Sequence, residues 1–238
     1  MIKEIQLKIP NELSSVKLRQ YQKYIKVANH DPDKEPTKEE IDFANLKLLE
    51  CFCGISLKEA YNLELTSFSH ILNHLSDIFK EETPLQQRFT MVDINGKEVE
   101  FGFIPNIEEI TLGEFVDLEK YIQSWETMHK AMAVLYRPVT FKNKNLYLIE
   151  DYKGSEKYSD AMLDSPLNAS LGANVFFYHL GRELSSHLTH SLANQVKSDS
   201  PLRQTLEQNG VGINQFMRLL EGMSQNLRTL QNYPYFNV

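Results

Sequence analysis

The chain has 238 residues, of which 42% are hydrophobic and 24% are charged, and its formal net charge is −7. This length fits one large domain or two small ones, and the composition predicts a packed core rather than a disordered chain. Affinity for nucleic-acid phosphates depends on clustered lysine and arginine, so a balance of 25 basic against 32 acidic residues argues against nucleic-acid binding as the main role.

No stretch of the sequence has the ~20 apolar residues that a membrane span needs, and residues 1–10 lack the pattern of a secretory signal. Cys51 and Cys53 stand one residue apart in a helical pattern. This spacing places them on different helix faces and predicts two buried free thiols rather than a disulfide. We therefore expect a soluble protein that is made in a reducing cytoplasm and has no membrane partner.

The first elements are a strand and two helices. Residues 2–9 alternate apolar and polar side chains, which predicts a half-buried strand that Pro10 ends. The helix that follows is expected to take Ser14 as its N-cap. The next helix begins at a capping box of Thr37 and Glu40 and runs to about Gly54.

An amphipathic helix is predicted over residues 65–79, because apolar side chains recur there at helical spacing. It carries His70 and His74, four residues apart, and two imidazoles at this spacing can share a metal ion. The His-Glu-x-x-His pattern is absent, and the pair lies at the polar edge of the apolar stripe. A solvated helix edge is the alternative interpretation, and it applies equally to His187 and His190.

Two β-hairpins are predicted in the second half of the chain. The first covers residues 88–104, where Asn95-Gly96 is flanked by alternating apolar residues. We expect it to form a small antiparallel sheet with the N-terminal strand. The second covers residues 139–152, where alternation surrounds an Asn/Lys turn.

Between the hairpins, Thr111 and Glu114 form a capping box, with Ile110 and Phe115 at the positions of a hydrophobic staple. A further helix is predicted over residues 128–136. Arg137 after it either complements the helix C-terminus, with Pro138 stopping the helix, or binds a ligand. The structural role is favoured.

Residues 5–25 and 99–122 share one order, a strand, an Ile-Pro-Asn stop and a capped helix. This similarity suggests an internal duplication, although strand-turn-helix units are common. The predicted fold is therefore α+β and predominantly helical, with two similar helical halves, a small antiparallel sheet and a C-terminal helix. The expected divisions are 1–86, 87–196 and 197–238.

No motif in the sequence identifies a reaction. An acidic segment formed by Asp151, Glu156, Asp160 and Asp164 could supply acid/base carboxylates or bind a cation, but its spacing fits no calcium loop, and a solvated face is favoured. A cluster of aromatic residues near the end of the chain contains Tyr233, Tyr235 and Phe236. Such aromatics either pack onto their own domain or anchor a protein partner.

The stretch ITLGEFVDLEKYI, followed by MHKAMAVLYRPV, YLIEDYKG and LGANVFFYHLGREL, resembles a family of largely uncharacterised proteins of tailed bacteriophages, including crAss-like and related phages. The resemblance is densest from Phe101 to Leu184. Such genes tend to lie among virion and tail-assembly genes, which implies a role in morphogenesis. No functional residues are carried over from this family.

The resulting expectation is a non-enzymatic phage morphogenesis protein, either a tail or connector component of the virion or a tail-assembly chaperone. Its partners would be other phage virion or tail proteins, with a homo-oligomer as a further expectation, and no cofactor is expected. It would act in the host cytoplasm during assembly or in the virion. The alternatives are a metal-dependent enzyme, through His70 and His74 or the acidic segment, and a small regulatory protein that binds a host factor.

Overall fold

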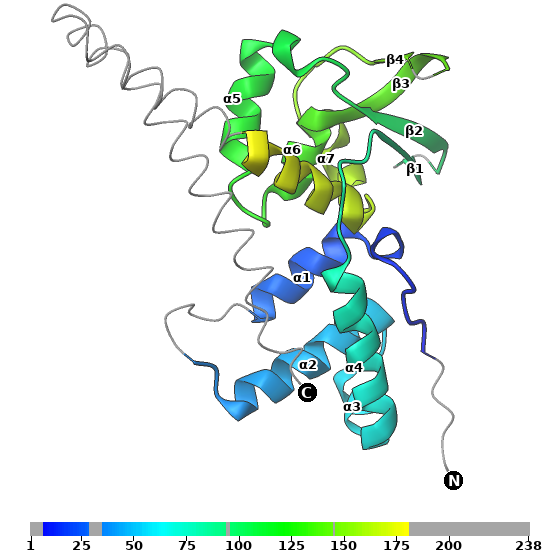
Figure 1. Cartoon of the computed structure of the whole chain (residues 1–238), viewed down its shortest axis with the longest axis vertical. Helices are drawn as coiled ribbons and strands as arrows, with labels where there is room; N and C mark the ends of the chain where they lie inside the picture. Colours follow the sequence, from blue (N-terminus) through cyan, green and yellow to red (C-terminus); the bar gives the residue numbers. More distant parts are fainter. Residues whose placement is uncertain (1–6, 29–34, 94–95, 145, 181–238) are drawn as a thin grey trace, which may run out of the picture.

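The computed structural model describes residues 7–28, 35–93, 96–144 and 146–180. Within these residues the chain is α+β and predominantly helical, with one four-stranded antiparallel sheet. Helices α1 to α4 gather at one end of the molecule, and the sheet lies at the other end with α5, α6 and α7 (Figure 1). The predicted fold class is therefore confirmed. The predicted C-terminal helix lies outside the described residues.

The first half contains four helices after a short 3-10 turn at Leu13–Ser15. They are α1 (Leu18–Ala28), α2 (Lys38–Cys53), α3 (Leu57–Tyr61) and α4 (Leu65–Lys80). The predicted helices over residues 37–54 and 65–79 are confirmed. In α4 the apolar stripe is buried at Ile71, Leu72 and Leu75, as its periodicity predicts, whereas Leu65 at its start is 78% exposed.

Helix ends follow local hydrogen-bonding rules. The Thr37 and Glu40 capping box is present at α2, and Gly54 ends that helix with φ 69°, a conformation that favours glycine. A second box, of Ser56 and Glu59, begins α3. The assignment of Ser14 as an N-cap is wrong, because its hydroxyl donates to Glu12 Oε1 at 2.5 Å and the helix starts only at Leu18.

The sheet has the order β1-β2-β3-β4, with every neighbouring pair antiparallel. Its strands are β1 (Arg88–Val92), β2 (Glu98–Phe103), β3 (Tyr136–Asn143) and β4 (Leu146–Ile149). Both predicted hairpins are confirmed, the first with Gly96 at φ 77° in its turn. The predicted N-terminal strand is wrong in its described part, since residues 7–9 belong to no strand, and β3 takes the place beside β2.

A close contact between Tyr147 and Gly102 fixes the two hairpins together. A Cβ atom at Gly102 would lie 2.6 Å from Tyr147 Cε2, so only glycine leaves room for the ring. The Tyr147 hydroxyl donates to the Phe103 carbonyl oxygen at 2.8 Å. The tyrosine of β4 therefore packs across β2, and Phe101 and Phe103 of β2 lie in the core.

The second half adds a 3-10 turn, three helices and a final helical segment. They are η2 (Ile107–Glu109), α5 (Leu112–Tyr121), α6 (Met128–Leu135), α7 (Glu156–Met162) and the helix over residues 167–180. The predicted helix over residues 128–136 is confirmed. It ends before Arg137, which lies in β3 and not at a helix terminus.

The start of α1 joins the two halves. Leu18 N donates to Ser165 O at 3.0 Å, and Arg19 N donates to Leu163 O at 2.8 Å. The Arg19 and Lys17 side chains both bind the Asp164 carboxylate, at 2.5 and 2.9 Å. One buried apolar cluster runs from α1–α4 into the sheet and α5–α7.

The helices of the two halves follow the same order, and their packing is partly parallel. α1 packs on α2 and α2 on α3, as α5 packs on α6 and α6 on α7. The lengths differ, since α2 has 16 residues and α6 has 8. In the described residues no strand precedes α1 as β2 precedes α5. The internal duplication and the division at residue 86 remain predictions.

Candidate functional site

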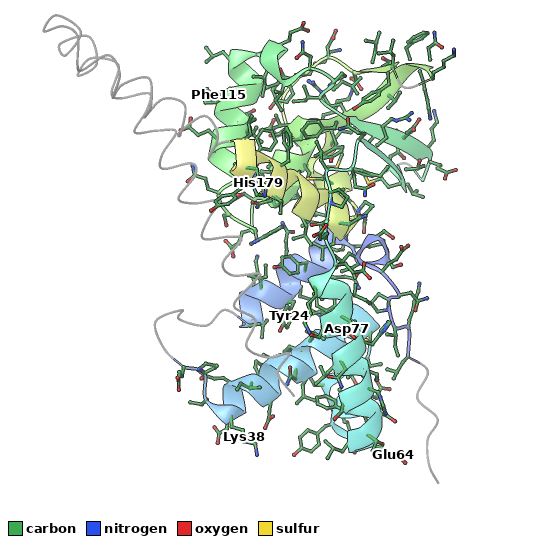
Figure 2. All side chains as sticks on the ribbon, viewed as in Figure 1. Tyr24, Lys38, Glu64, Asp77, Phe115 and His179 are labelled. Carbon is green, nitrogen blue, oxygen red and sulfur yellow. The ribbon has the colours of Figure 1, made fainter. Side chains whose placement is uncertain are left out.

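Helix α5 is folded with its polarity reversed in the first two turns. Glu114 is only 4% exposed, whereas Leu112 is 79%, Phe115 40% and Val116 51% exposed. These three apolar residues stand at i, i+3 and i+4, so they share one helix face, called here the α5 stripe. Phe115 lies on the side of α5 that faces away from the sheet (Figure 2). A water-facing stripe of this kind is the opposite of what an amphipathic helix on a core shows.

A buried ion pair holds α5 in this orientation. Arg137 Nη2 of β3 lies 2.6 Å from Glu114 Oε1, and both side chains are less than 10% exposed. The other oxygen, Glu114 Oε2, accepts hydrogen bonds from the backbone N–H and the hydroxyl of Thr111, at 2.7 Å each. One carboxylate therefore completes the predicted capping box and also ties α5 to the sheet.

A second polar contact reinforces the first. The Tyr152 hydroxyl donates to the Asp117 carboxylate of α5, and the Arg137 guanidinium lies over the Tyr152 ring, 5.5 Å from its centroid. Burial and the hydrogen bond to Asp117 raise the pKa of Tyr152. The phenol stays protonated at neutral pH and keeps donating to α5. Arg137 thus has a structural role through Glu114 and Tyr152, and the predicted contact with helix carbonyls is replaced by this ion pair.

An open cleft of about 470 Å³ lies beside this ion pair. The start of α5 and the segment before it form one wall, through Asn106, Glu109 and Thr111, and β4 with the following loop forms the other, through Leu148 and Asp151. Arg137 and Glu114 also line the cleft, and the Arg137 Nε has no hydrogen-bond partner among the described residues.

More apolar surface lies on the second hairpin. Phe141, Leu146 and Leu148 are 55%, 76% and 59% exposed, and this group is called here the hairpin patch. Phe141 pairs with Leu148 across β3 and β4, so the two side chains are neighbours. Leu148 also lines the cleft, whose opposite wall includes Thr111, next to Leu112 of the α5 stripe. Of the side chains in these two groups, Leu148 is the one that lines the cleft.

The predicted histidine pair has a structural explanation. His70 and His74 are both exposed on α4, and His74 Nε2 lies 3.0 Å from the Pro10 carbonyl oxygen. This hydrogen bond fastens the N-terminal segment to α4. No group of three or more His, Cys, Asp or Glu side chains in the described part of the chain could hold a metal ion.

The acidic segment is divided among different surroundings. Asp164 binds Lys17 and Arg19 at the junction of the halves, while Asp151 lines the cleft. Glu156 and Asp160 are exposed in α7. The structure therefore does not bring these four carboxylates together. His187, His190, Tyr233, Tyr235 and Phe236 lie outside the described residues.

The two thiols are buried, as predicted. Cys51 and Cys53 are free and only 5% and 3% exposed. Burial raises the pKa of Cys53 to about 11 and also raises that of Cys51. Neither thiol is placed or ionised as a nucleophile needs to be.

The sequence did not reveal the α5 stripe, because a capping box normally precedes a helix whose apolar residues face inward. The available clue was composition. Between Asn106 and Glu119 the chain has five carboxylates and no lysine or arginine, so apolar and acidic residues compete for the core side of one short helix. The second indication was Arg137, a cation in the chain segment that follows and the residue that pairs with Glu114.

No protein-family model, curated protein or solved structure matches this chain. Among the described helices, none combines the length and apolar content needed to cross a bilayer.

Proposed function

We propose that this protein is a non-enzymatic binding component of phage morphogenesis, which acts by holding another virion or tail protein against α5 and the second hairpin. The observation that carries the binding role is the reversed polarity of α5, with Glu114 buried and the α5 stripe in solvent. The phage setting comes from the family resemblance of residues 101–184 alone.

Burial of the α5 stripe by another molecule would be favourable in free energy. Exposed apolar area loses roughly 25 cal/mol per Å² relative to burial, and a contiguous apolar patch on a soluble protein marks an interaction site. Six exposed large apolar side chains form two groups, three in the α5 stripe and three in the hairpin patch, and Leu148 of the hairpin patch lines the cleft. A partner that covers both groups would gain the apolar contact that the α5 stripe does not make with the described part of the chain.

The charged groups around the stripe support binding over catalysis. Glu114 is occupied by Arg137 and Thr111, and Glu150 by Lys157 and Tyr158. The Lys157 and Tyr158 contacts lower the pKa of Glu150, so this carboxylate is not tuned to take up a proton near neutral pH.

Mass spectrometry of purified virions tests the setting. A stoichiometric amount of the chain in mature particles would assign it to the tail or connector, and its absence despite strong expression in infected cells would assign it to assembly. Absence from both virions and assembly intermediates would contradict the proposal.

Affinity purification from infected cells tests the surface. We expect Leu112→Ser/Val116→Ser to lose the phage proteins that the wild-type chain captures, at an unchanged free energy of unfolding. Leu65→Ser is the matched control, because Leu65 is 78% exposed on α4 at the other end of the molecule. Equal capture by all three chains would remove the α5 stripe from the proposed function.

A further inference from the structure

The segment that leads into α5 and the first turns of this helix are rich in acidic residues. Five carboxylates lie between Asn106 and Glu119 with no lysine or arginine among them, and they are Glu108, Glu109, Glu114, Asp117 and Glu119. Asp151 adds a further carboxylate at the opposite wall of the cleft.

Internal contacts neutralise only part of this charge. Arg137 pairs with Glu114, and Tyr152 donates to Asp117. Glu109 and Asp151 are exposed, line the cleft and make no ion pair among the described residues. Two uncompensated carboxylates therefore line a cleft that also has apolar lining residues, Ile104 and Leu148 among them.

This pattern disfavours a symmetric contact in which the cleft of one copy meets the cleft of a second. Such a contact would bring Glu109 and Asp151 of the two copies together, and like charges placed opposite each other weaken an interface. A partner that covers the apolar side chains must instead bring positive charge to the two cleft carboxylates, Glu109 and Asp151, which are called here the rim.

We infer that the cleft receives a lysine or arginine side chain of a protein partner, and that apolar residues beside that cation on the partner cover the α5 stripe. This inference rests on the proposed binding function and names the chemistry of the partner. Glu109 and Asp151 would receive the cation at the mouth of the cleft. The volume of about 470 Å³ accommodates a long basic side chain.

The rim charges and the α5 stripe would contribute differently to the binding of the partner. Rim charges mainly raise the association rate and add a modest, salt-dependent part of the affinity. Apolar contacts on the α5 stripe would supply the larger, salt-independent part. Neutralising the rim should therefore weaken binding several-fold, and removing the stripe should abolish it.

The test uses the full chain and two synthetic 18-residue helical peptides. Both carry leucine at i, i+3, i+4 and i+7; one has lysines beside that stripe and the other has glutamates at the same positions. Fluorescence anisotropy gives their affinities for the protein at low and at physiological salt. We expect the lysine peptide to bind at least ~10-fold more tightly than the glutamate peptide, with the difference shrinking as salt rises.

Matched variants locate the effect. Glu109→Gln/Asp151→Asn should weaken the lysine peptide by ~5-fold and flatten its salt dependence, because surface charge pairs contribute modestly. Asp42→Asn/Glu64→Gln makes the same change of charge at exposed positions of the other end of the molecule and should leave binding unchanged. Leu112→Ser/Val116→Ser should abolish binding.

Two results would overturn the inference: equal affinity for both peptides, or equal weakening by the two charge variants. The proposed function would survive either result if phage proteins were still lost from the stripe variant in affinity purification. Peptide binding together with unchanged capture of phage proteins would instead contradict the proposed function.

Discussion

Helices α4 and α5 show two different ways of holding a helix on the same core. In α4 the apolar stripe faces inward, with Leu72 and Leu75 buried. In the first turns of α5 the buried residue is Glu114, while Leu112 and Val116 face solvent. Apolar contact with the core therefore holds α4. In α5 three apolar side chains are exposed among the described residues, and polar contacts hold the helix in place.

Apolar periodicity alone does not decide which face of a helix is buried. A stripe predicts the buried face when apolar contact alone fixes the helix, as in α4. When a buried cation such as Arg137 lies next to the helix, a glutamate can occupy the inward position and pair with it. The apolar neighbours of that glutamate then face outward. The following predictions test this contrast.

The largest effect is expected for Glu114→Ala, which leaves the buried Arg137 charge without its partner. Removing one member of a buried ion pair costs about 3–5 kcal/mol. Urea unfolding of the variant should show this loss, and Glu119→Ala on the same helix should stay within about 0.5 kcal/mol of wild type.

A double variant makes the assignment specific. In Glu114→Met/Arg137→Met neither charge remains, so most of the lost stability should return. A loss below about 1 kcal/mol for Glu114→Ala, or a double variant no better than the single one, would contradict a role for the ion pair in orienting α5.

The next prediction compares the loss of stability when a leucine is truncated in α4 and in α5. Leu75→Ala in α4 removes a fully buried side chain and should lower the free energy of unfolding by about 2–5 kcal/mol. Leu112→Ala in α5 should change it by no more than about 0.5 kcal/mol, since that side chain is in water. Chemical denaturation of the two variants side by side measures the difference. Comparable losses would mean that the α5 stripe packs within its own chain.

A smaller effect concerns the glycines of the second half. A Cβ atom at Gly172 would lie 2.5 Å from the Pro84 carbonyl oxygen, so Gly172→Ala should cost about 1–3 kcal/mol. At Gly113 in α5 the nearest atom, Tyr152 Cε1, is 4.0 Å away. Gly113→Ala should therefore raise stability by up to about 1 kcal/mol through helix propensity. Thermal unfolding of the two variants measures these changes in stability. Equal effects of the two substitutions would be inconsistent with these packing distances.

The smallest effect is alkaline. Burial raises the pKa of Cys53 from 9.0 to about 11, so the neutral thiol contributes stability that is intact below pH 9 and is lost as pH rises toward 11. By pH 10 this loss should reach about 1 kcal/mol. Denaturation at pH 8 and pH 10 measures it, and Cys53→Ala should lose less. An identical alkaline loss in both proteins would show that Cys53 does not contribute.

Elements specified by local chemistry could be predicted from the sequence. The capping box of Thr37 and Glu40, the turn at Gly96 and the stripe of α4 each depend on neighbours in the chain, and each is confirmed. The box of Ser56 and Glu59 at the start of α3 follows the same local rule.

What the sequence did not predict depends on distant partners. Phe115 fits the position of a hydrophobic staple, yet it is 40% exposed because Glu114 bonds Arg137, 23 positions later in the chain. The N-terminal segment was expected to join the sheet of the first hairpin, and β3 pairs with β2 of that hairpin instead. Nothing local distinguishes these alternatives, since each requires knowing which segments meet.

Site-specific photo-crosslinking in infected cells tests the central claim most directly. A photoreactive phenylalanine analogue would replace Val116 of the α5 stripe and, in a separate chain, Leu65 of α4. The account predicts a crosslink from position 116 to a phage protein and none from position 65. Crosslinks from both positions alike, or from position 116 only to its own chain, would contradict the claim that α5 turns its apolar face outward to bind a partner.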